Sequence, residues 1–346
     1  MKGNQTRWIS VVGLVLMMAL SVGSVNAQEA KHVEHHMIEA VADGNSGTHG
    51  AQAGMTSTAM MWRASTNDVM KRIGEVRLSG DDTGLWMKYH KGKLETESYM
   101  AKFKNSYKAY QLGYDGQVSE RWLAGTSISF YDGESDFAGG GEGKNDVISL
   151  SVYGMQKASG GKYLSLAGKL SYFDNGINVY DGSADKLGGK YQSWGTSISA
   201  QYGKRLEKTN GFYFDPNMQL TVGRVQDKNY RMTDSNFSGM LVRQDDADSI
   251  VGRLGFAMGQ KTKRANYFTE FSIARELGGD MSTDFAIDGE TGTSESMDFR
   301  STWYELTLGG GVELGNQTTL YATYEHSFGG DIKEKYRLDG GVKISF

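Results

Sequence analysis

The sequence predicts an all-β transmembrane protein built as a closed antiparallel barrel, and three observations lead to that prediction. Apolar and polar residues alternate from Gly84 to the end of the chain, and clusters of Gly, Asp, Asn and Ser interrupt the alternation. Pro216 is the single proline beside 47 glycines and 19 tyrosines, which favours long paired strands because proline removes a ladder hydrogen bond. Past residue 27 no apolar run reaches 18 residues, which excludes a bundle of membrane helices.

The composition sets further limits on function. The chain has 346 residues, no cysteine and a formal net charge of -4, so neither a disulfide framework nor a basic nucleic-acid surface is expected. No Gly-x-Ser-x-Gly elbow and no phosphate-binding loop occur in it. We therefore expect no enzyme activity, no cofactor and no nucleic-acid partner.

Residues 1–27 are predicted to be a secretory signal peptide, with a basic start, an apolar core and a small-x-small site that ends at Ala27. Residues 28–56 are rich in His, Ala and Gly and are expected to form a disordered linker or the remnant of a longer exported segment. His32 and His36 are four residues apart and would share one face of a helix, so metal binding is the alternative reading of this segment.

Residues 57–74 change to a helical pattern, in which apolar residues recur between polar and charged ones. The polar positions that would face a pore are Arg63, Asn67, Asp68, Lys71 and Arg72. Residues 75–346 are predicted to form the barrel.

Twelve strands are predicted from the alternation. They cover residues 84–91, 107–117, 121–131, 146–156, 162–173, 191–204, 211–224, 249–260, 265–275, 302–314, 318–327 and 336–346. Tight turns at one end would alternate with long polar loops at 132–145, 174–190, 225–248 and 276–301, and the loop at 225–248 has room for an extra hairpin.

The two faces of these strands distinguish a membrane barrel from a soluble one. Apolar faces begin or end in aromatic residues, as with Trp122 and Phe130 or Trp194 and Tyr202, and such aromatic girdles are typical of the two membrane interfaces. The opposite faces carry isolated charges that suit a wet lumen. The candidates for the lumen are Asp115, Arg253, Glu270, Glu305 and Arg337.

The last strand shows the apolar face most clearly. Its outward residues are Tyr336, Leu338, Val342, Ile344 and Phe346. A terminal strand that ends on Phe resembles the closing strand of outer-membrane barrels, so we expect these residues to act as an insertion signal. The closing strand of a soluble barrel is the alternative.

Several short motifs resemble the C-terminal translocator domain of the autotransporter family, in the same order and spacing over residues 72–346. The helix-to-barrel junction is similar at Arg72-Ile73-Gly74-Glu75-Val76-Arg77. Further matches lie at 84–88, 110–115, 216–225, 249–255, 327–331 and 344–346.

This resemblance implies a twelve-stranded outer-membrane barrel of a Gram-negative bacterium, with the helix threaded through its pore. It implies outer-membrane lipid, the barrel-assembly machinery and periplasmic chaperones as partners. The family exports a passenger that precedes the barrel, whereas only about 29 residues separate the signal from the helix here. The passenger was lost, lies on a separately encoded chain, or the barrel serves alone.

One motif carries a possible reaction. Self-cleaving members of the family cut the chain when an Asn side chain attacks its own carbonyl carbon, and Asn67-Asp68 lies at the corresponding distance before Arg72. Acidic lumen residues assist the reaction in those members, and Asp115, Glu270 and Glu305 are candidates for that role. We favour the alternative, in which Asn67 and Asp68 only line the pore.

The prediction is thus an autotransporter barrel that translocates a passenger or anchors a surface segment. The alternatives are a passive pore or a structural or adhesive protein that binds through its outer loops.

Overall fold

The computed structural model describes residues 46–79, 83–96, 103–137, 141–180, 186–233, 239–287, 293–315 and 317–346. All of them belong to one compact unit, Ser46–Phe346. The predicted signal peptide, the linker up to residue 45, and His32 and His36 within it lie outside the described residues.

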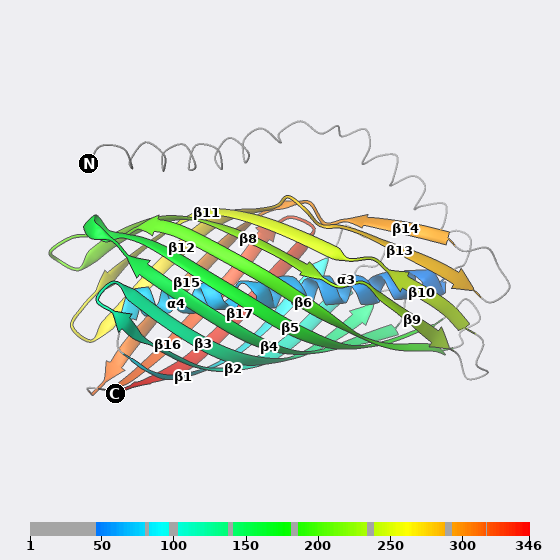
Figure 1. Ribbon diagram of the computed structural model, residues 1–346, viewed down its shortest axis with the longest axis horizontal. Helices are drawn as coiled ribbons and strands as arrows, with labels where there is room; N and C mark the ends of the chain where they lie inside the picture. The colour runs from blue at the N-terminus through cyan, green and yellow to red at the C-terminus, as the bar shows by residue number, and fades with distance from the viewer. Residues whose placement is uncertain are drawn as a thin grey trace. The chain divides into compact units, whose positions relative to one another are not determined.

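Twelve long strands among the described residues form a closed ring (Figure 1). They are β1 (Gly84–Thr96), β2 (Phe103–Ser119), β3 (Trp122–Phe137), β4 (Gly141–Lys157), β5 (Lys162–Tyr180), β6 (Lys186–Lys204), β8 (Phe212–Val225), β11 (Ala247–Lys261), β12 (Ala265–Glu276), β15 (Thr302–Leu314), β16 (Thr318–Gly329) and β17 (Ile332–Ser345). Each is antiparallel to its neighbours, and β17 pairs with β1 to close the ring. The predicted twelve-stranded antiparallel barrel is confirmed.

The two ends of the barrel differ in their connections. At one end, here called the turn end, strands are joined by short segments such as the 3-10 turn Ser159–Gly161 between β4 and β5. At the opposite end, here called the loop end, the strands are longer than predicted and the connections carry further strands. The stretches 132–145 and 174–190 were expected to be loops, but most of their described residues continue β3, β4, β5 and β6.

The connection of β8 to β11 contains β9 (Lys228–Thr233) and β10 (Gly239–Gln244), which pair as a hairpin. The connection of β12 to β15 contains β13 (Asp280–Ile287) and β14 (Thr293–Asp298), which also pair with each other. Strand β10 pairs with β13, so the two hairpins join into one sheet at the loop end. The hairpin expected within 225–248 is confirmed. The two-residue strand β7 (Leu206–Glu207) pairs with the first residues of β8 at the turn end.

A row of large side chains marks one edge of the outward apolar band. Strand register places Tyr89 opposite Tyr110, Tyr110 opposite Phe130, and Phe130 opposite Ile148. The row continues through Tyr172 to Trp194. These side chains face outward on alternate positions, and Tyr110 is 59% exposed. A register-matched girdle of this kind is what a membrane interface requires.

The polarity of the strands inverts beyond this row. On β3 the residues Tyr131 and Phe137 point inward and are buried, whereas Asp132, Glu134 and Asp136 point outward and are exposed. Side chains still alternate between the two faces of the strand on either side of this row. Beyond the row, however, the outward face contacts water instead of lipid. The loop end of the barrel is therefore packed like a soluble β-barrel, with an apolar core inside.

Two helices lie inside the ring: α3 (Ser46–Thr66) and α4 (Asp68–Ser79) (Figure 1). Together they extend beyond both ends of the predicted helix at 57–74. The prediction of a disordered linker over 28–56 is therefore wrong for residues 46–56, which are helical. The helix α3 continues through Gly54. This glycine packs so close to Ile177 that a Cβ at its position would overlap the Ile177 side chain. Asn67 lies between the two helices in a turn. Within the described residues, neither helix is long and apolar enough to span a bilayer.

Candidate functional site

The lumen is the candidate functional site, and ion pairs hold α4 within it. Arg72 of α4 donates from Nε and Nη2 to Asp115 Oδ2 of β2, at 2.9 and 2.7 Å. Lys343 Nζ lies 3.1 Å from the other carboxylate oxygen, and Tyr153 donates to Asp115 Oδ2 at 3.0 Å. The guanidinium also stacks over Trp86 at 4.6 Å from the ring centroid. All five side chains are buried, so each charge is matched by its partners in a region from which water is largely excluded.

A second ion pair fixes the last turn of α4. Arg77 Nε lies 2.9 Å from Asp215 Oδ2 of β8, and Tyr163 donates to the other oxygen of that carboxylate at 2.8 Å. Arg205 donates from Nη1 to the backbone carbonyl of Arg77 at 3.0 Å. That carbonyl belongs to the helix end, where backbone acceptors lack partners within the helix. The barrel wall thus satisfies both the side chain and the backbone of the last turn.

A third cluster forms at the start of α4. Asp68 forms an ion pair with Arg337 of β17 at 2.6 Å and accepts a hydrogen bond from Gln111 Nε2 at 2.9 Å. Arg337 also pairs with Asp339 at 2.9 Å. His90 lies between the two carboxylates, with Nε2 3.8 Å from Asp68 and Nδ1 3.5 Å from Asp339. The structure brings together Asp68 and Arg337, which sequence analysis selected, with three wall residues that it did not select.

Three wall residues hold the helices by further polar contacts. Lys71 of α4 forms an ion pair with Glu325 of β16 at 2.7 Å. Lys169 of β5 donates to the carbonyl of Ser65, near the end of α3, at 2.5 Å. Glu75 pairs with Lys88 of β1. The charges of α4 are therefore matched by charges on β1, β2, β8, β16 and β17, strands that lie far apart in the sequence.

Helix α3 sits in apolar surroundings instead. Trp62 packs beside Phe173 at 6.3 Å between ring centroids, and a Cβ on Gly195 would lie 2.7 Å from the Trp62 ring. Met60 and Met61 are fully buried in the same core, which the inward residues of the loop end complete. Side chains of α3 also form hydrogen bonds with uncharged groups of the wall, as between Thr58 and the Tyr191 hydroxyl at 2.7 Å and between the hydroxyls of Ser57 and Ser135 at 2.8 Å. Ion pairs thus hold α4, whereas α3 packs mainly among apolar and uncharged polar side chains.

Arg63 is the exception on α3, since its guanidinium stacks over Trp303 at 3.4 Å from the ring centroid. Trp303 donates from Nε1 to Glu305 at 2.7 Å, and Arg253 lies 3.2 Å from the same carboxylate. Two of the predicted lumen residues, Arg253 and Glu305, therefore pair with each other. Glu270 forms no hydrogen bond or ion pair within the described part of the chain and lines a cavity instead.

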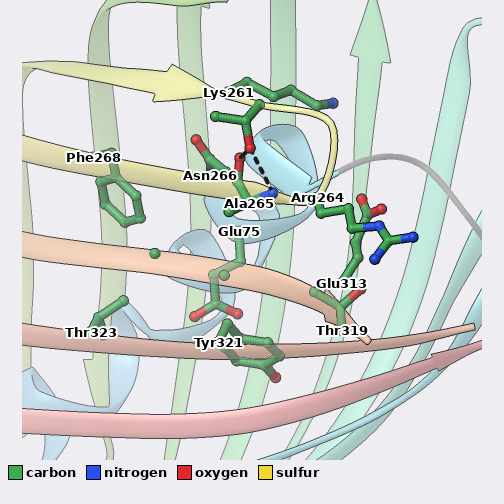
Figure 2. Close-up of a pocket in the computed structure, with 13 residues that line it drawn as sticks. Glu75, Lys261, Arg264, Ala265, Asn266, Phe268, Glu313, Thr319, Tyr321 and Thr323 are labelled. Atoms are coloured by element: carbon green, nitrogen blue, oxygen red, sulfur yellow. Dashed lines mark hydrogen bonds between the residues drawn. The ribbon is translucent and has the colours of Figure 1, made fainter. Parts of the chain in front are cut away.

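Cavities follow one side of the helices, against β11, β12, β15 and β16. A cavity of about 70 Å³ is lined by Asn67, Lys71 and Glu270, among other polar residues, and has room for water. It shares Asn67, Lys71, Arg253, Glu305 and Glu325 with the next cavity toward the loop end. Toward the turn end, Glu75, Phe268 and Thr323 also line the opening drawn in Figure 2. In Figure 2, Glu75 points into this opening from α4.

Asn67 separates the two helices and faces the wall through its side chain. Gln219 Nε2 donates to Asn67 Oδ1 at 2.8 Å. The backbone carbonyl of Asn67 accepts a hydrogen bond from the Lys71 amide at 3.1 Å, which begins α4. Of the three candidate acids, Asp115 and Glu305 are paired with arginines, and Glu270 faces the cavity that Asn67 also lines.

The terminal strand has the predicted facing. Phe346 is 71% exposed and Ile344 and Leu338 also face outward, while Val342 and Tyr336 are half-buried. Arg337, Asp339 and Lys343 point into the lumen and are buried.

Comparison with known proteins agrees with this architecture. A family described as the autotransporter beta-domain matches residues 85–325. The pertactin autotransporter of Bordetella parapertussis is 27% identical over 317 residues, covering 89% of this chain and 33% of that protein. The BrkA autotransporter of Bordetella pertussis is 25% identical over 354 residues, covering 100% of this chain and 34% of that protein. The chain thus spans about a third of the length of these curated relatives.

Solved structures share the fold. The translocator domain of the autotransporter NalP from Neisseria meningitidis superposes with a TM-score of 0.71 at 17% identity, covering 84% of this chain and 98% of that one. The β domain of the Bordetella autotransporter BrkA gives a TM-score of 0.61 at 21% identity, covering 77% of this chain and 100% of that one. The barrel lies in the outer membrane of a Gram-negative bacterium, and the chain belongs to the autotransporter family through the family's β-domain.

Proposed function

We propose that this barrel holds a segment of its own chain at the cell surface, as the translocator of a passenger or as the anchor of a short exported segment. The direction of the helix is the observation that carries the proposal. Helix α3 begins at the loop end, and α4 finishes at the turn end and leads into β1. In outer-membrane barrels the short turns face the periplasm and the longer connections face outward. The helix therefore presents its N-terminal end to the outside.

The fit of the helix supports anchoring. Arg72 and Arg77 of α4 each pair with a buried carboxylate, and Trp62 of α3 is packed among inward residues of the wall. Undocking the helix would leave the buried carboxylates of Asp115 and Asp215 with fewer partners, which is costly. A segment joined to this helix is consequently held at the outer rim. A separately encoded passenger, the barrel-assembly machinery and periplasmic chaperones are the proposed protein partners, the last two acting on the strand that ends at Phe346.

An epitope placed before the helix tests the proposal. Insertion of a short epitope between residues 40 and 41 should make intact cells bind the antibody and lose that signal on protease treatment. The matched control carries the same epitope at Gly160, in the 3-10 turn of the turn end, and should stain only after the cells are permeabilised. The proposal fails if the first insertion stains only permeabilised cells while the barrel is inserted.

We further propose that Asn67 and Asp68 are pore contacts and that the chain is not cut between them. Asn67 Oδ1 accepts a hydrogen bond from Gln219, and Asp68 is bound by Arg337 and Gln111. The intact mass of the purified outer-membrane protein tests this. A measured mass equal to that of a chain beginning at Asp68 would refute the proposal. If this shorter chain is then absent from the variant Asn67→Ala, cleavage is driven by the Asn side chain.

A passive pore is the second candidate, favoured by the cavities that follow the helix along β11, β12, β15 and β16. Their lining carries charges of both signs, among them Glu75 and Glu270 and the bases Lys71 and Arg264. Conductance of the intact protein in planar bilayers, with reversal potentials in a salt gradient, distinguishes this candidate.

A further inference from the structure

The turn end carries a group of exposed bases that the lumen does not use. They lie on neighbouring strands and turns from β5 to β12, and we call them the basic rim. The group consists of Lys162, Lys204, Lys208, Lys261, Lys263 and Arg264. Within the described residues none of the six forms an ion pair. Glu207 lies in the same region, but it pairs with Arg205 at 3.2 Å.

The loop end carries exposed bases of both kinds. Arg224 is paired with Asp246 and Asp248 at 2.9 and 2.6 Å, whereas Lys91, Lys108 and Lys190 form no ion pair within the described residues. Arg300 likewise pairs with Asp280 at 3.2 Å and with Asp298 at 2.7 Å. Exposed positive charge is thus present at both ends of the barrel, and the six bases of the basic rim lie on neighbouring strands and turns of the turn end.

Two members of the basic rim stand directly opposite each other. Strand register pairs Lys162 of β5 with Lys204 of β6. Like charges at opposed positions of neighbouring strands destabilise a sheet, so an anion between them would offset that cost. Their neighbours two residues inward along the same face are Leu164 and Tyr202, which are also paired in register. Tyr202 is 40% exposed on the outward face. The two lysines thus sit where the lipid-facing band ends.

The adjacent bases extend this position around the barrel. The ammonium of Lys208 lies 5.6 Å from the ring centroid of Phe212, at the same end of β8. In Figure 2, the charged ends of Lys261 and Arg264 point toward the turn end and away from Phe268. The turns are held together by backbone hydrogen bonds, from Arg205 to Gly161 at 2.8 Å and from Lys261 to Gly211 at 2.9 Å. The bases are therefore carried on a fixed frame.

We propose that the basic rim binds the phosphate head groups of anionic phospholipids in the periplasmic leaflet of the outer membrane. The rim lies directly below an outward apolar band, and lipid head groups occupy that level of a bilayer. Clusters of Lys and Arg at a membrane surface attract anionic lipids by about 1 kcal/mol for each base. The inference rests on the membrane orientation given by the strands and does not depend on whether a passenger is moved.

Lipid retention by the purified full chain tests the proposal. The protein in mixed micelles is offered phosphatidylglycerol or phosphatidylcholine, and bound lipid is counted by native mass spectrometry. The wild type should retain phosphatidylglycerol in preference. The variant with Lys162→Gln, Lys204→Gln and Lys208→Gln should bind it about fivefold more weakly for each lysine removed. A variant with Lys144→Gln, Lys186→Gln and Lys190→Gln loses equal charge at the loop end and should bind as the wild type does.

Three results would overturn the proposal. These are equal retention of both lipids by the wild type, retention by the rim variant that matches the wild type, and an equal loss in the loop-end control. Preference for added polyglutamate with no preference between the lipids would identify an acidic polypeptide as the partner and likewise reject a lipid. Heat-modifiable gel migration shows that each variant is folded. Raising the salt concentration should release the lipid from the unaltered wild type, because exposed charges are screened.

Discussion

Replacing Arg72 with Met should destabilise the protein strongly, since it removes one partner of a buried ion pair and keeps most of the side-chain volume. Arg72 and Asp115 are 2% and 0% exposed, and the closest approach is 2.7 Å. Removing one partner of a buried pair costs about 3–5 kcal/mol. Lys343 remains 3.1 Å from Asp115, so the lower end of that range is expected, about 3 kcal/mol. At about 2 °C for each kcal/mol in a large domain, Tm should fall by about 6 °C.

The assay is the temperature at which the compact band on a gel converts to the unfolded one, in one detergent for all variants. Arg224→Met removes an exposed ion pair at the loop end and should leave this temperature unchanged. The variants Arg72→Met, Asp115→Asn and their combination form a double-mutant cycle, and the combination should cost less than the sum of the two single changes. Additive effects, or a Tm for Arg72→Met equal to that of the wild type, would show that the pair does not hold the helix.

Four further predictions concern the plug and the barrel. Deleting residues 57–70 should raise single-channel conductance in planar bilayers and lower Tm, because a twelve-stranded barrel is too wide for wall side chains alone to fill; equal conductance of the intact and shortened proteins would contradict a plugged pore. Deleting Phe346 should lower the amount of inserted barrel and leave protein in the periplasm, whereas unchanged yield would argue against its role as an insertion signal. Trp62→Ala should cost about 3–5 kcal/mol in unfolding free energy, because the side chain fills the space beside Phe173 and Gly195. Extraction in mild detergent should give heat-modifiable migration, and recovery from the soluble periplasmic fraction would refute the membrane location.

The barrel itself was predictable because the membrane imposes a simple pattern. Within the apolar band, lipid on one side and a polar lumen on the other produce strict alternation, as in Leu164, Leu166 and Leu170 of β5 against Ser165 and Lys169. The strand count, the closing strand and the outward girdle all follow from that alternation. Each predicted strand corresponds to one strand of the ring.

The loop end was harder to predict because its alternation has the opposite polarity. Residues 132–136 of β3 read as a polar loop, yet their charged members face water and Gly133 and Ser135 face the core. Adjacent apolar pairs such as Phe130 and Tyr131 mark the position where the apolar side changes from outside to inside. These apolar pairs are present in the sequence, but they can be interpreted only when the position of the membrane boundary on each strand is known.

The lumen contacts could not be predicted as pairs. Sequence analysis selected Asp68, Arg72, Asp115 and Arg337 by their type and facing, but which charges meet depends on strand register and on the rotation of the helix. Asp68 of α4 meets Arg337, which lies 269 residues later in the chain on β17. Sequence analysis did not select His90, and its position between Asp68 and Asp339 follows from the closure of the ring.

The charge matching of α4 also limits how the barrel can work. Lys71, Arg72 and Arg77 each meet a carboxylate on a different strand, so a shift of the helix by one residue would turn all three away from their partners. Moving these charges past one another in the lumen would expose several unpaired buried ions at once. Docking of α4 and passage of another segment through the same lumen are therefore mutually exclusive. Any translocation by this barrel has to precede the state described here, in which the helix serves as a fixed plug and anchor.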